Sequence, residues 1–132
     1  MFLNQLSTNA KHAFMVLAEQ AAEANGILED EEKLMIEAFR IEMNIGQDMP
    51  VSFDDKTALD FIAQGSERTR RIVYLELLAL LKSGEGYDDE EQEHVSRLQV
   101  ELGLDDDTAQ RIDSQLGDYE YVYTRLCETI LV

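Results

Sequence analysis

One short pattern occurs twice in the chain, first as Asn25-Gly26-Ile27-Leu28-Glu29-Asp30-Glu31-Glu32 and again as Glu85-Gly86-Tyr87-Asp88-Asp89-Glu90-Glu91. In each copy a glycine follows an apolar helical run, one apolar residue packs the turn, and carboxylates open the next run. Glycine is the usual residue just after a helix, and acidic side chains favour a helix N-terminus. The repetition therefore indicates an internal duplication of a helix-loop-helix unit.

Apolar residues at helical spacing on both sides of the two copies predict an all-α protein, and no segment reads as a strand. We expect seven helices, over residues about 7–24, 30–44, 54–64, 67–83, 89–102, 105–116 and 118–131. The segment 67–83 is apolar on nearly all sides, which predicts that it forms the centre of the core. The last segment carries an apolar stripe made of Tyr119, Val122, Tyr123, Leu126 and Ile130.

A length of 132 residues with 45% hydrophobic residues suits one domain with a single core. We expect a single compact bundle over residues 1–132, built from two related units at about 7–64 and 66–116. A seventh helix, 118–131, is expected to start at Gly117-Asp118 and to be appended to these units. No linker is long enough to separate a second domain.

The net charge of −17 limits the classes of partner. Such a chain is repelled by phosphate backbones and by anionic lipid surfaces, so nucleic-acid binding is not expected. The longest strongly apolar stretch, 72–81, is far shorter than the roughly 20 residues that cross a bilayer, so membrane insertion is not expected either. A single cysteine and the lack of a signal-peptide pattern predict a reduced, cytoplasmic protein.

The duplicated pattern resembles that of the tellurite-resistance TerB-like family, over roughly Phe14 to Leu104. The resemblance implies a compact, all-helical, cytoplasmic bacterial domain associated with stress-response and chaperone-like modules. It also implies that acidic residues of the loops bind a divalent metal. Asn25 and Glu85 stand where the family usually has a turn aspartate, which weakens the metal prediction more than the fold prediction.

The acidic residues of the two copies have two interpretations. As N-caps and first-turn residues, Asp30 and Asp89 would each stabilise a helix start without any ligand. The segment 85–93, however, contains more carboxylates than capping requires, and a divalent cation would relieve their repulsion. Oxygen ligands predict Ca²⁺ or Mg²⁺ as that cation. The candidate metal ligands are Glu29, Glu32, Glu85, Asp88 and Glu91.

Two functions from different classes follow. The first is a non-enzymatic TerB-like stress-response and interaction domain with an unidentified protein partner, without catalytic or cofactor-binding residues. The alternative is a helical-bundle carboxylate metal enzyme or redox protein using Glu91, His94 and Glu76, because Glu91 and His94 have the Glu-x-x-His spacing of di-iron bundles. Otherwise Glu76 is expected at the rim of the core, or paired with Arg71 or Lys82.

Two surface features complete the predictions. Arg68, Arg70 and Arg71 form the sole cationic cluster, and we expect them to pair with acidic loops, an anion site being the alternative. Tyr121, which lies off the stripe of the last helix, and the apolar N-terminal residues 2–3 and 6 are candidate contacts for a protein partner. The oligomeric state is not predicted.

Overall fold

A computed structural model describes residues 1–23, 30–45, 53–83 and 87–132. These residues form helices and no strands, which confirms the all-α prediction for this part of the chain. None of these helices is long and apolar enough to cross a membrane. The elements are a short 3-10 helix η1 (Leu3–Gln5) and the α-helices α1 (Thr8–Glu23), α2 (Asp30–Met43), α3 (Asp55–Ala63), α4 (Glu67–Ser83), α5 (Asp89–Glu101) and α6 (Asp106–Ile130).

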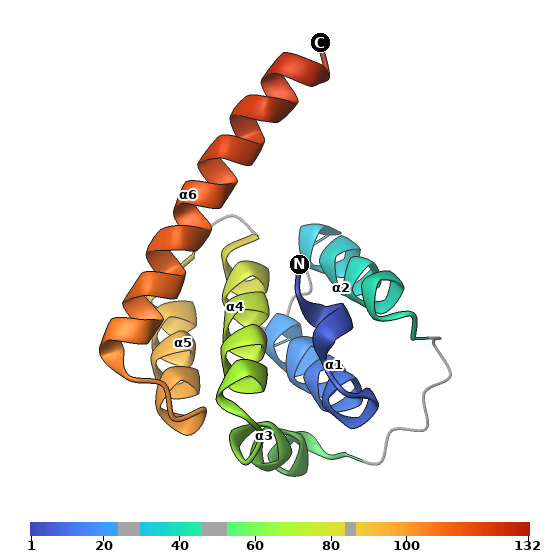
Figure 1. Cartoon of the computed structure of the whole chain (residues 1–132), viewed down its shortest axis with the longest axis vertical. Coiled ribbons are helices and arrows are strands. Elements are labelled where there is room, and N and C mark those ends of the chain that lie inside the picture. The colour runs from blue at the N-terminus through green and yellow to red at the C-terminus, as the bar shows by residue number, and fades with distance from the viewer. Residues whose placement is uncertain (24–29, 46–52, 84–86) are drawn as a thin grey trace.

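Helix α4 forms the centre of the molecule and contacts every other described helix. In Figure 1 it lies between α1 and α2 on one side and α5 and α6 on the other. Nine of its residues are buried, from Ile72 to Leu81 without a break except for half-buried Leu75. An all-round apolar helix is stable in water only when neighbours cover it on all sides. The predicted core helix is therefore confirmed.

Aspartates define the starts of three helices. The side chain of each accepts a hydrogen bond from the backbone N–H three residues later, which is the N-cap arrangement. These bonds are Thr57 N to Asp54 (2.7 Å), Glu91 N to Asp88 (2.9 Å) and Thr108 N to Asp105 (2.7 Å). In the second acidic copy the cap is thus Asp88, and Asp89, expected in that role, is the first helical residue. Asp30 likewise opens α2, and the residue before it lies outside the described ranges.

The predicted helix break at Gly117 is wrong. Helix α6 continues through this residue from Asp106 to Ile130, so six α-helices occupy the described residues where the sequence predicts seven helices. The structural reason is that Gly117 is exposed on the helix surface, with no atom within 4 Å of the place where a Cβ would stand. A lone glycine costs a helix only about 1 kcal/mol relative to alanine, which does not end it.

The two halves of α6 have different surroundings. The first half is held on the body of the protein by buried Ala109 and Leu116, by Ile112, and by an ion pair between Lys82 of α4 and Asp113. The second half, from Gly117 onward, projects beyond the other helices, as Figure 1 shows. Every residue of 117–132 is exposed except half-buried Cys127.

Two glycine-to-alanine substitutions test this description. Gly117→Ala should raise the free energy of unfolding by about 1 kcal/mol, because it removes the conformational freedom of a glycine inside a helix. Gly103→Ala should lower it by about 1 to 2 kcal/mol, because Gly103 has φ +68° and its Cβ would lie 3.1 Å from a guanidinium nitrogen of Arg70. Urea unfolding followed by circular dichroism measures both. A destabilising Gly117→Ala would contradict the continuous helix.

Candidate functional site

The start of α5 carries the larger acidic group, and the structure gives part of it a structural role. Asp88 caps the helix, while Asp89 and Glu90 point into solvent in its first turn. Glu91 is half-buried near Tyr87, whose ring lies 5.3 Å from the ammonium of Lys82. Burial, together with the charges of Asp113 and Glu91, raises the pKa of Tyr87. Tyr87 therefore packs against the core, and Asp88 is engaged in capping.

The predicted metal ligands are only partly described. Glu29 and Glu85 lie outside the described residues, as does the predicted turn residue Leu28. Glu32 lies in the first turn of α2, whereas Asp88 and Glu91 lie at the start of α5, and α4 separates these two helices in Figure 1. No group of three or more His, Cys, Asp or Glu side chains suited to a metal ion occurs among the residues that the structure describes.

Glu76 has a partner that the sequence analysis missed. Its side chain is only 3% exposed, and its Oε1 accepts hydrogen bonds from the N-terminal ammonium of Met1 (2.8 Å) and from the backbone N–H of Phe2 (3.1 Å). Glu42 of α2 also pairs with this ammonium, at 2.9 Å. The expectation of a partner in Arg71 or Lys82 is wrong, because these pair with Glu67 and Asp113. The pattern of side chains does not show the terminal amine, so the sequence analysis could not identify it as the partner of Glu76.

The ammonium of Met1 is the charge that balances the buried carboxylate. Burial alone lowers its pKa, but hydrogen bonds and charges from Glu76 and Glu42 outweigh burial, so the pKa is raised above its ordinary 8.0. The amine thus stays protonated at neutral pH and joins the first residues to α4 and α2. This contact explains how one acidic side chain is tolerated in the most apolar helix.

His94 lies in a different part of the molecule. It is half-buried in a groove of about 470 Å³ between α1, α3 and α5, which Leu17, Leu59 and Arg97 also line. Burial and the charge of Arg97 lower the pKa of His94, so its imidazole is neutral at pH 7. Neither Glu76 nor Glu91 lines this groove. The described contacts therefore do not bring together the three residues of the alternative enzyme site.

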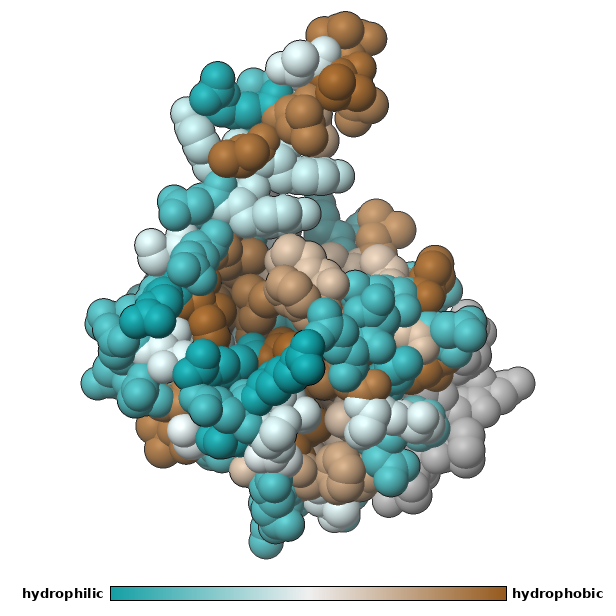
Figure 2. All heavy atoms as spheres, in the orientation of Figure 1, coloured by the Kyte–Doolittle hydropathy of each residue, from teal (hydrophilic) through white to brown (hydrophobic). Residues whose placement is uncertain are grey.

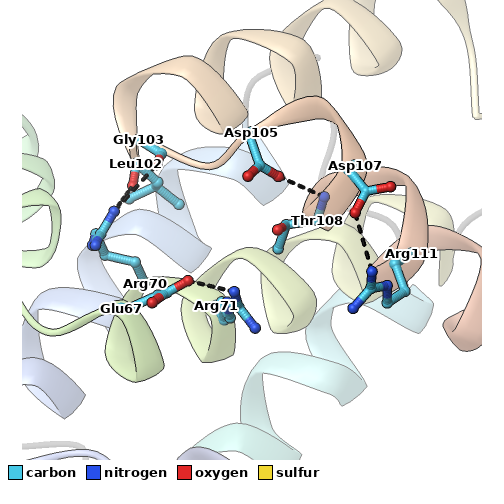
Figure 3. A network of polar contacts seen from close by, with 9 residues as sticks. All are labelled: Glu67, Arg70, Arg71, Leu102, Gly103, Asp105, Asp107, Thr108 and Arg111. Atoms are coloured by element: carbon cyan, nitrogen blue, oxygen red, sulfur yellow. Dashed lines mark hydrogen bonds and ion pairs between the residues drawn. The ribbon is translucent and has the colours of Figure 1, made fainter.

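Within the arginine cluster, Arg70 joins α4 to the end of α5, as Figure 3 shows. Arg70 donates to the carbonyl oxygens of Leu102 (3.1 Å) and Gly103 (3.2 Å), which end α5. Arg71 pairs with Glu67 on its own helix, and Arg68 donates to the side chain of Gln5. The expected pairing of this cluster with the duplicated acidic loops is not what these contacts show.

Two of these arginines line an open groove of about 540 Å³ at the base of α4. Phe2, Ile72, Leu75 and Ile112 contribute apolar surface to it. The guanidinium of Arg68 is hydrogen-bonded to Gln5, and that of Arg71 is paired with Glu67. An anion entering the groove would have to displace these partners, so the contacts favour a structural role for both arginines.

The stripe on the second half of α6 is an apolar surface without an intramolecular cover among the described residues. Its five side chains are between 49% and 65% exposed: Tyr119, Val122, Tyr123, Leu126 and Ile130. The rings of Tyr119 and Tyr123 stack with their centroids 6.0 Å apart, and a hydrogen bond with Cys127 raises the pKa of Tyr123. Figure 2 shows apolar side chains gathered toward the end of this segment.

The other predicted contact residues divide into two groups. Tyr121 is 64% exposed on a different face of α6, with Arg125 over its ring. Phe2 is also exposed, but Leu3 and Leu6 are buried in the core. The sequence identified the stripe but not its exposure, because amphipathic spacing shows that one face is apolar without showing what covers it.

Substitution of Asp88 separates capping from metal binding. Asp88→Ala should lower the free energy of unfolding by about 1 kcal/mol in EDTA, because the Glu91 N–H loses its acceptor. Asp88→Asn should retain most of the stability, since asparagine is as good a cap as aspartate. Thermal unfolding with EDTA, Ca²⁺ or Mg²⁺ measures both effects. If Asn and Ala instead cost the same, and only when a cation is present, Asp88 is a ligand.

The Glu76 contact predicts a pH dependence of stability. Because the folded pKa of the Met1 amine lies above its unfolded value, the contribution is fully present below about pH 8 and is lost as pH rises through the folded pKa. Glu76→Gln should lower the free energy of unfolding by about 1 to 3 kcal/mol and flatten this decline. Chemical unfolding between pH 6 and pH 10 measures both effects. Glu42→Gln, at the more exposed partner, should cost less, and an equal or larger loss would contradict the assignment.

Comparisons with known proteins do not assign a family or a function to this chain. No family model matches the chain, and neither a curated protein nor a solved structure does. The resemblance to the TerB-like family therefore stays a prediction that rests on the duplicated pattern.

Proposed function

We propose that this chain is a non-enzymatic TerB-like interaction module that binds another protein through the second half of α6. The observation that carries the proposal is the exposed stripe on the projecting helix. Soluble proteins rarely leave a contiguous apolar patch of several hundred Å² uncovered unless it binds something. The body positions this helix, since Ala109, Ile112 and Leu116 fix its first half against α4.

The distribution of carboxylates also supports a non-enzymatic role. Glu76 is engaged with Met1, and Asp88 with the start of α5. His94 lies in a groove to which neither Glu76 nor Glu91 contributes. Catalysis by carboxylates and histidine requires these groups to converge within hydrogen-bond reach of one reacting centre.

The finer parts of the proposal come from the family resemblance. A TerB-like module would act in the cytoplasm in a bacterial stress response, with a weakly bound Ca²⁺ or Mg²⁺ at the acidic loops as a secondary feature. The surplus of carboxylates at the start of α5 supports this secondary feature. The binding of a protein by α6 does not depend on it.

A pair of matched variants tests the role of the stripe. The chain and its interaction partners are cross-linked in the cells that make it, and the captured proteins are compared by mass spectrometry. Leu126→Glu/Ile130→Glu should lose at least 90% of the specific captures, because two charges are placed within the stripe. Tyr121→Glu, an equally exposed site off the stripe, should retain them. Circular dichroism should show equal helix content for all three. If the variants capture the same proteins, α6 is not the binding surface.

A further inference from the structure

The stripe belongs to a longer regular pattern. Apolar residues recur along α6 at alternating intervals of three and four residues, which is the heptad spacing of coiled coils. They are Ala109, Ile112, Leu116, Tyr119, Tyr123, Leu126 and Ile130. The first three pack on the body of the protein, and the last four continue the same helix face without a neighbour. One face of α6 is therefore an intramolecular contact at one end and an open coiled-coil seam at the other.

We propose that the open seam is covered by α6 of a second copy of this chain, packed antiparallel. This inference rests on the proposed function, since it names the partner of the same surface. Three observations carry it: the position of the body on α6, the register of the four exposed residues, and the charges beside the seam.

The position of the body selects the antiparallel orientation. Ala109 and Leu116 attach the body to the same face of α6 that carries the seam. In a parallel pair, two bodies would occupy the same space at the base of the two helices. In an antiparallel pair they lie at opposite ends, and each helix tip reaches toward the body of the other copy. This orientation also separates two chains that each carry a net charge of −17.

In one antiparallel register, each of the four exposed seam residues faces a seam residue of the second copy. When Tyr123 faces Leu126 of the second copy, Tyr119 faces its Ile130, and two-fold symmetry repeats both layers. Every tyrosine then packs against an aliphatic side chain. A register one heptad lower would place the second copy against Leu116, which its own body already covers. The pairing of a large with a smaller side chain in each layer favours such interdigitation.

The residues flanking the seam suit a second copy better than a basic partner. In this register Val122 lies near Thr129 of the second copy, and Glu120 lies near its Cys127. No like charges face each other across the seam. Residues 117–132 carry three acidic side chains against one basic, a small share of the excess acid in the chain. A basic partner would be recognised by acidic flanks, whereas these flanks are largely neutral.

The buried area is sufficient for a reversible dimer. Covering the stripe on both copies would bury roughly 1,000 Å² in total, which is the size of weak, transient interfaces. The stacked rings of Tyr119 and Tyr123 lose little freedom on binding, because the stack already exists in the single chain. We therefore expect a dimer that dissociates on dilution.

Sedimentation velocity of the full chain between about 1 and 200 µM tests the second copy. A concentration-dependent dimer is expected, and Leu126→Glu should raise its dissociation constant at least 100-fold. Tyr121→Glu should change it less than threefold, because Tyr121 lies off the seam. Circular dichroism confirms that both variants are folded. A chain that stays monomeric at 200 µM, or a dimer that Leu126→Glu does not weaken, overturns the proposal.

A spin-label distance tests the orientation. A label at Gln110→Cys, an exposed site near the start of α6, is introduced with Cys127→Ser so that it is the single thiol. In the antiparallel register the two labels are offset by about 40 Å along the helices. In a parallel pair they are level with each other, and about 25 Å or less apart. A distance in the shorter range overturns the antiparallel arrangement.

The two sets of measurements distinguish failure of this inference from failure of the proposed function. A monomeric chain that captures another protein through the stripe would refute self-association and leave the interaction module standing. A chain that neither self-associates nor loses captures on Leu126→Glu/Ile130→Glu would refute both.

Discussion

The structure depends on the need to cover α4 on all sides. Its buried residues face every direction, so the other helices are arranged around it, and α1, α2, α3, α5 and α6 each contact it. The same constraint explains why Glu76, a charged residue buried in this helix, is matched by an ammonium rather than left alone. Removing a carboxylate from water costs far more than a hydrogen bond returns, unless an opposite charge accompanies it. The N-terminal residues thus contribute both apolar side chains that cover α4 and the charge that pairs with Glu76.

The long last helix uses one sequence pattern for two purposes. Its first half satisfies the requirement of α4 for a neighbour, whereas its second half has the same apolar spacing and no neighbour. Continuity through Gly117 is what links them, because a break there would allow the second half to fold back on the body. Because α6 is one continuous helix, the attachment of its first half to the body fixes where the seam lies. At the start of α5, in contrast, Asp88 of the second acidic copy has a local role as the cap of that helix.

Local chemistry made most of the fold predictable. The spacing predicts the apolar run of α4, and the structure has it. In the structure Asp54 and Ser66 accept the N-cap bonds of α3 and α4, and Gly103, at positive φ, follows α5. The predicted break at Gly117 is wrong because glycine occurs both within helices and just after them. Only the heptad spacing that continues past Gly117 distinguishes these two positions. The partner of Glu76 and the pairings of the three arginines could not be predicted, because they are contacts between residues distant in sequence, apart from Arg71 with its near neighbour Glu67. The stripe was visible in the sequence, but its lack of a cover was not.

Cys127 gives this arrangement an internal reporter. It is the only cysteine of the chain, it flanks the seam on α6 one turn after Tyr123, and it is half-buried. Its half-buried sulfur is reachable by small reagents as long as the seam is open. Any partner that covers the seam would shield this thiol, so the rate of its alkylation measures occupancy of the surface. Occupancy of the seam can thus be followed chemically, in dilute solution or inside cells, without attaching anything to either end of the chain.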